Sequence, residues 1–129
     1  MNNISLPSGS ATSYSSILGQ MIAQARAHRS LHQIDLADAL GITQTAWSRI
    51  ERGITSITAE QLRTIAGFLQ REPHEIIREA DSAAKIATDN GLALVAPKNY
   101  DELVKNGVMI LMGAALGAAI LHMYMKSKA

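Results

Sequence analysis

The sequence contains no cysteine, which excludes a disulfide framework and a zinc site built from thiolates. It shows no nucleophile–base pair, carboxylate dyad or phosphate-binding loop, so we do not expect an enzyme. His28 and His32 are four residues apart, but Ser30 is expected to break the helix between them. The histidines therefore show no tight metal-ligand spacing, and we expect neither a metal site nor a cofactor.

Lysine is absent from residues 15–80, where seven arginines are matched by seven acidic residues. This segment is therefore neutral, whereas a nucleic-acid-binding domain usually carries a basic surface. Any DNA affinity must come from the local placement of Arg29, Arg49 and Arg52, and from multivalency.

The most informative stretch is Gly41–Gly53, GITQTAWSRIERG. Gly41 can end a helix in the left-handed conformation, and Thr43 can cap the next helix through its side-chain oxygen. Ala46, Trp47 and Ile50 then fall at helical spacing and can face a core. Two helices joined by a short glycine-containing turn predict a helix-turn-helix.

Four stretches between Leu18 and Leu69 carry a resemblance: LGQMIAQAR at 18–26, LHQIDLADALGIT at 31–43, WSRIERG at 47–53 and TAEQLRTIAGFL at 58–69. Their order is similar to that of the Cro/phage-repressor (XRE-type) helix-turn-helix family. The resemblance implies an all-α fold with a five-helix domain, and double-stranded DNA as the partner. In that docking geometry, the helix at 44–52 enters the major groove.

The resemblance also implies roles for individual residues. Gln33 stands where family members contact a DNA phosphate, and His32 stands where they usually have Ser or Thr. Arg26 and Glu51 stand at positions that form a structural salt bridge. The expected DNA-binding residues, several of which also suit base reading by residue type, are Gln33, Thr43, Gln44, Thr45, Ser48, Arg49 and Arg52.

Apolar periodicity and capping signals predict helices at about 16–29, 32–40, 44–52, 59–69 and 73–88. Thr58 and Gln61 form a capping box for the fourth, and Pro73 suits the first turn of the fifth. The serine-rich residues 1–15 predict a flexible tail. We therefore divide the chain into this tail, a helix-turn-helix domain at 16–90, a linker at 91–98 and a C-terminal helix at 99–129.

Residues Gly107–Met125, GVMILMGAALGAAILHMYM, contain no charge. A helix of this length spans about 28 Å, close to the thickness of a bilayer core. Gly113, Gly117, Ala114 and Ala118 give small-residue spacings that allow close helix packing. Three interpretations stay open: a membrane anchor, a helix buried in an oligomer, and a core helix folded onto its own domain.

Two functions follow from these patterns. The first is a sequence-specific DNA-binding regulator, repressor-like, tethered or oligomerised through its C-terminal helix. The second is a protein-interaction scaffold that does not act on DNA, similar to the membrane-anchored helix-turn-helix proteins of the bacterial cell-shape machinery. In both cases we expect a homo-oligomer with its domain in the cytoplasm, either free or anchored to the inner membrane through Gly107–Met125.

Overall fold

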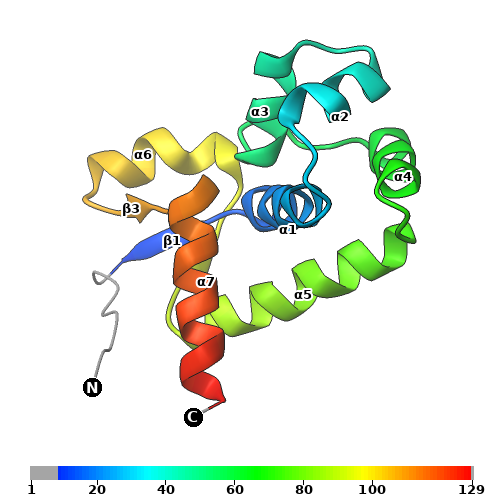
Figure 1. The fold of residues 1–129 in the computed structure, drawn as a ribbon. Helices are drawn as coiled ribbons and strands as arrows, with labels where there is room; N and C mark the ends of the chain where they lie inside the picture. The colour runs from blue at the N-terminus through cyan, green and yellow to red at the C-terminus, as the bar shows by residue number, and fades with distance from the viewer. Residues whose placement is uncertain (1–8, 129) are drawn as a thin grey trace.

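A computed structural model describes residues 9–128, which form seven α-helices and a small sheet (Figure 1). The first five helices are α1 (Tyr14–His28), α2 (Gln33–Leu40), α3 (Gln44–Glu51), α4 (Ala59–Phe68) and α5 (Pro73–Asp89). The other elements are β1 (Ser10–Thr12), β2 (Ala93–Leu94), the 3-10 turn η1 (Pro97–Asn99), α6 (Tyr100–Lys105), β3 (Met109–Ile110) and α7 (Gly113–Ser127).

Local capping signals set the boundaries of the first five helices, which agree with the predicted ranges to within two residues. Gly41 ends α2 with φ of 66°, and Thr43 Oγ1 accepts a bond from the Ala46 amide at 3.1 Å. Thr58 and Gln61 bond reciprocally at the start of α4, as a capping box requires. The helix-turn-helix and its capping residues are therefore confirmed.

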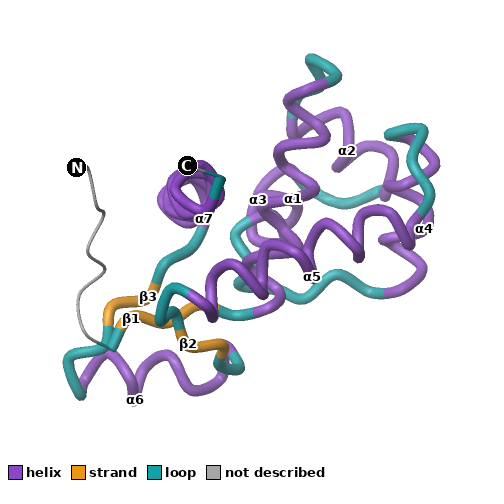
Figure 2. The backbone as a smooth tube through the Cα atoms, turned by 90° about the horizontal axis from the view of Figure 1, so that it is seen from below, coloured by secondary structure: helices purple, strands orange, loops and turns teal. Residues whose placement is uncertain are grey.

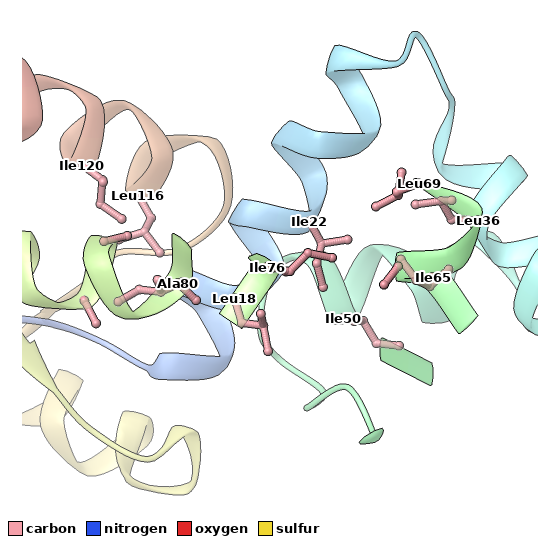
Figure 3. Close-up of a cluster of buried hydrophobic side chains, with 14 of the residues drawn as sticks. Leu18, Ile22, Leu36, Ile50, Ile65, Leu69, Ile76, Ala80, Leu116 and Ile120 are labelled. Atoms are coloured by element: carbon pink, nitrogen blue, oxygen red, sulfur yellow. The ribbon is translucent and has the colours of Figure 1, made fainter. Parts of the chain in front are cut away.

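Helix α1 lies at the centre of the fold and packs against α3, α5 and α7 (Figure 1). Its residues Ile17 and Ile22 are fully buried, and the core continues through Leu36 of α2 and Ile65 of α4 (Figure 3). Trp47 has no exposed surface, which confirms its interpretation as a core residue.

The prediction of a flexible tail over residues 1–15 is wrong from residue 10 onward. Ser10, Ala11 and Thr12 form β1 and are at most 1% exposed. Ser13 is also buried and caps α1 through a bond from the Ser16 amide. The polar composition suggested disorder, but the backbone N–H and C=O groups of β1 are paired in a sheet. The side chains of Ser10, Ala11 and Thr12 are small, which suits their buried position. Residues 1–8 lie outside the described part of the chain.

β1 is the central strand of a three-stranded parallel sheet with order β2-β1-β3 (Figure 2). Ala11 pairs with Ala93 on one side and with Ile110 on the other. The segment predicted as a linker at 91–98 therefore contributes strand β2 and the start of η1. Together with α6, the sheet lies at one end of the molecule, away from α2 and α4 (Figure 2).

The prediction of one C-terminal helix at 99–129, with a continuous apolar helix at 107–125, is also wrong. Gly107, with φ of 83°, forms the turn after α6, and β3 follows before α7 begins at Gly113. The Leu111 amide bonds to the Ala11 carbonyl at 2.9 Å, and Thr12 Oγ1 donates to the Leu111 carbonyl at 2.6 Å. A short apolar run fits a strand as well as a helix, and pairing with β1 decides the outcome here.

Helix α7 packs onto α1 and α5 of its own chain and buries Leu116 and Ile120 in the same core (Figure 3). Burying each such side chain is worth roughly 1.5–3 kcal/mol. The interpretation of this segment as a core helix is therefore the one observed. Within residues 9–128, every helix is too short or too polar to span a lipid bilayer.

The four small residues expected to pack helices together separate into two pairs. Gly117 is buried against α1, where a Cβ atom would collide with the side chain of Gln20. Gly113 has φ of 60° and lies beside the Arg52 side chain. Ala114 and Ala118 are exposed. The close packing is thus made within the chain, by Gly117 against α1.

Candidate nucleic-acid interface

The helix-turn-helix places one face of α3 in solvent and the other in the core. Trp47 and Ile50 point inward, whereas Gln44, Thr45 and Arg49 are exposed. The division follows the helical period, because residues three and four positions apart share a face. The side chains expected to read bases are therefore available on one surface.

Two further residues, one on α3 and one directly after it, extend this surface. Ser48 is partly exposed, and its carbonyl accepts a long bond from Arg52 Nε at 3.4 Å. Arg52 itself is exposed at the end of the helix. Thr43 is exposed as well. Its side-chain oxygen caps α3, so this residue fixes the start of the helix.

The buried carboxylate of Glu51 fixes α3 to its neighbours. It accepts bonds from Arg26 Nε at 2.7 Å and Arg26 Nη2 at 3.0 Å, which is the ion pair implied by the resemblance. It also accepts the Trp47 indole N–H at 2.7 Å and the Gln33 amide at 2.9 Å. These last two bonds were not predicted. One carboxylate thereby joins α1, α2 and α3, which fixes the orientation of the exposed face.

The side chain of Gln33 belongs to the Glu51 network and also reaches the surface. One hydrogen of its side-chain amide is given to Glu51, and the side chain is only partly buried. An amide carries two hydrogens, so the second can still be donated to a phosphate oxygen. The bond to Glu51 holds the amide in place for such a contact.

The start of α2 carries a cap that sequence reasoning missed. Asp35 Oδ2 accepts the His32 amide at 2.7 Å, so this carboxylate is turned onto its own helix. Asp38 remains exposed. The spacing of three residues between His32 and Asp35 was the available signal, and the unusual histidine obscured it.

A hollow of about 340 Å³ lies beside α3, between α1, α2 and the start of α7. Its lining includes Arg26, Ser48 and Arg52, together with Gly113 and Ala114 from the start of α7. No feature of the sequence placed the start of α7 beside α3. Among residues 9–128, no three side chains of the metal-binding types gather into a candidate site.

Known proteins share the helix-turn-helix part of this structure. Residues 22–76, from the middle of α1 to the start of α5, match a family model described as helix-turn-helix. Two crystal structures of the clp gene regulator ClgR from Corynebacterium glutamicum share the fold. The first has 23% identity and a TM-score of 0.52, and covers 54% of this chain and 91% of that one. The second has 17% identity and a TM-score of 0.57, with coverages of 73% and 93%.

No curated protein matches the sequence. The family match coincides with the helices whose caps and ion pair are described above, and the structural match reaches beyond it into the later elements. Residues 22–76 are therefore similar to the helix-turn-helix family, in agreement with the order of motifs in the sequence.

Proposed function

We propose that this chain is a sequence-specific DNA-binding transcriptional regulator that inserts α3 into the major groove. The observation that carries the proposal is the exposed row Gln44, Thr45 and Arg49 on a helix that the Glu51 network holds in place. The regulator named in the similar crystal structures supports the class of function. Such a protein acts where the chromosome lies, in the cytoplasm.

The chemistry of this row suits base edges. A glutamine can bond adenine with two hydrogen bonds, an arginine can bond guanine in the same way, and a threonine methyl can contact thymine. Gln33 and Arg52 flank the row and suit phosphate oxygens, which position a protein without specifying sequence. The assignment of these roles is part of the proposal.

The neutral charge of the domain bears on how tightly one copy can bind. Because phosphate neutralisation supplies most non-specific affinity, a neutral domain with a few arginines binds weakly alone. Two linked copies gain effective concentration at two half-sites. The proposal therefore includes a homo-oligomer, at least a dimer, but no membrane tether, since α7 packs on its own domain.

The proposal is tested by selecting preferred DNA sites from a random library with the full chain and titrating the best site. We expect Gln44→Ala and Arg49→Ala each to lose about 1–3 kcal/mol of discrimination at one base position. Arg63→Ala, on the exposed side of α4, is the matched control and should keep the site preference. Unchanged preference in both α3 variants would remove the assignment of base readers.

The neutral charge also favours a second function, a protein-interaction scaffold. The two functions differ at low salt. A DNA-binding protein shows at least non-specific affinity, and this affinity falls steeply as salt rises. If the full chain shows no DNA affinity at about 50 mM salt, the scaffold function replaces the regulator.

A further inference from the structure

A groove of about 800 Å³ lies between α5 and α7 and reaches α1. We call it the α5–α7 groove. Its apolar lining consists of Met21, Ala83, Ile86, Ile120, Leu121 and Tyr124. Ile120 points from α7 toward α5 and belongs to the hydrophobic core (Figure 3). Small-molecule sites are typically mainly apolar and have volumes of about 300–1,000 Å³, so the groove has the size and lining of such a site.

The wall that α5 contributes to this groove changes from polar to apolar along the helix. Arg78, Glu79 and Ser82 come before Ala83 and Ile86, and all five line the groove. They share one side of α5, because positions three and four apart lie on the same face. Arg78 and Ile86 are eight residues apart, which corresponds to about 12 Å along the helix axis. This wall therefore suits an elongated molecule with a polar head and an apolar chain.

Arg78 is the charged group of the groove without a partner. The carboxylates of α5 are all engaged within the chain, by Arg71 for Glu75 and Glu79, by Tyr14 for Asp81 and by Lys85 for Asp89. Among residues 9–128, the Arg78 guanidinium forms no ion pair. Lys128 Nζ lies 5.2 Å from the centre of the Tyr124 ring, which adds a second cation beside the groove. The groove therefore offers a positive charge to an anionic ligand.

We infer that the α5–α7 groove binds a single-chain fatty carboxylate, with its carboxylate on Arg78 and its alkyl chain along Ala83 and Ile86. A guanidinium can hold a carboxylate through two parallel hydrogen bonds, and Gln24 and Ser82 add neutral donors to the same groove. The alkyl chain removes apolar surface of α5 and α7 from water. A purely apolar ligand would leave the cation unpaired, and a cationic ligand would be repelled.

This site goes beyond the proposed function and does not depend on it. Apart from Met21 and Gln24, every lining residue of the groove comes after residue 76, where the family match ends. Helix α3 contributes no lining residue. Ligand binding can therefore be measured in the absence of DNA, and a chain that binds the ligand but never binds DNA keeps this site and loses the regulator.

Isothermal titration calorimetry of the full chain with sodium dodecanoate tests the inference, at concentrations below those that form micelles. We expect saturable binding. Dodecyltrimethylammonium carries the same alkyl chain on a cationic head, and acetate carries the carboxylate without the chain, so neither should bind. The chain should also not cosediment with phosphatidylglycerol vesicles, which present anionic heads in a membrane.

Two variants assign the binding to the groove. Arg78→Met removes the guanidinium and should raise the dissociation constant for dodecanoate at least about tenfold. Ser82→Trp fills the groove and should abolish binding. Arg63→Met and Thr64→Trp, on α4, are the matched controls and should bind like the unmodified chain. All four substituted side chains are exposed, so circular dichroism should report an intact fold.

Absence of saturable dodecanoate binding would overturn the inference, as would equal binding of dodecyltrimethylammonium. Unchanged affinity in both Arg78→Met and Ser82→Trp would place the ligand elsewhere and overturn it as well. Cosedimentation with the vesicles without binding of free dodecanoate would replace the fatty carboxylate by a membrane surface. If dodecanoate does not bind and Ser82→Trp dissociates a dimer of the chain, the occupant of the groove is a second copy instead.

Discussion

Glu51 shows how one buried side chain positions an exposed surface. It is only 4% exposed and receives four hydrogen bonds from three side chains. A buried carboxylate is tolerated only when such partners replace water. The exposed face of α3 thus owes its orientation to a residue that lies on the opposite side of the same helix.

Removing the cation of this pair should be costly. We expect Arg26→Met to lower the free energy of unfolding by about 3–5 kcal/mol, because Glu51 would stay buried without its counter-charge. Urea denaturation followed by the fluorescence of Trp47 measures the loss. The exposed Arg71–Glu79 pair is the matched control, and Arg71→Met should cost less than about 1 kcal/mol. Equal losses in the two variants would contradict the buried network.

Gly19 is required by the distance between two helices. A Cβ atom there would collide with the backbone carbonyl oxygens of Ile50 and Glu51, which cannot rotate away. We expect Gly19→Ala to destabilise the fold by at least about 1–3 kcal/mol. Gly67 in α4 has no neighbour within 4 Å of such an atom, and Gly67→Ala should stabilise by about 0.4–1 kcal/mol. Thermal unfolding of both variants would show opposite shifts, and a harmless Gly19→Ala would exclude the close approach.

At the scale of elements, a polar contact joins the start of α1 to α5, in addition to the apolar packing between the two helices. The Tyr14 hydroxyl donates to Asp81 Oδ1 at 2.7 Å. Burial, together with the hydrogen bond and the charge of Asp81, raises the pKa of Tyr14 from 10.0 to about 12. The folded state therefore holds this proton more tightly than the unfolded state does.

This shift predicts a dependence of stability on alkaline pH. The stabilisation is complete below pH 10 and is lost as pH rises toward 12, because the unfolded chain loses the proton first. Tyr14→Phe should show a shallower fall in unfolding free energy across that interval than the unmodified chain. Tyr124→Phe, which leaves the contact intact, serves as the control. Identical pH profiles for Tyr14→Phe and the unmodified chain would show that the contact is absent.

Helices with local signals could be predicted from the sequence, and elements that depend on distant partners could not. Capping signals act within one helical turn, so those at Gly41, Thr43 and Thr58 allowed the boundaries of α2, α3 and α4 to be predicted. Strand β1 is three residues long and pairs with β2 and β3, which both lie far along the chain, so no local pattern marks it. Of the Glu51 network, the resemblance implied only the ion pair with Arg26, since the bonds from Trp47 and Gln33 depend on packing.

At the scale of the whole molecule, the apolar composition of residues 107–125 suggested that this segment is buried in a membrane or in an oligomer. Composition indicates how much apolar surface must be buried, but not which part of the protein or its surroundings buries it. The glycines at 107 and 113 both have positive φ, and they divide the segment into a turn, a strand and a helix. The buried side of this helix, which includes Leu116 and Ile120, then packs on α1 and α5 of its own chain.

The central place of β1 in its sheet also determines the order in which the protein can be completed during synthesis. The helices within residues 22–76 contact one another over short distances along the chain, and such contacts form quickly once the segment has left the ribosome. Ser10, however, pairs with Met109, so this contact of β1 must wait until residue 109 has been translated. The helix-turn-helix thus assembles early, while β1 finds its partners late.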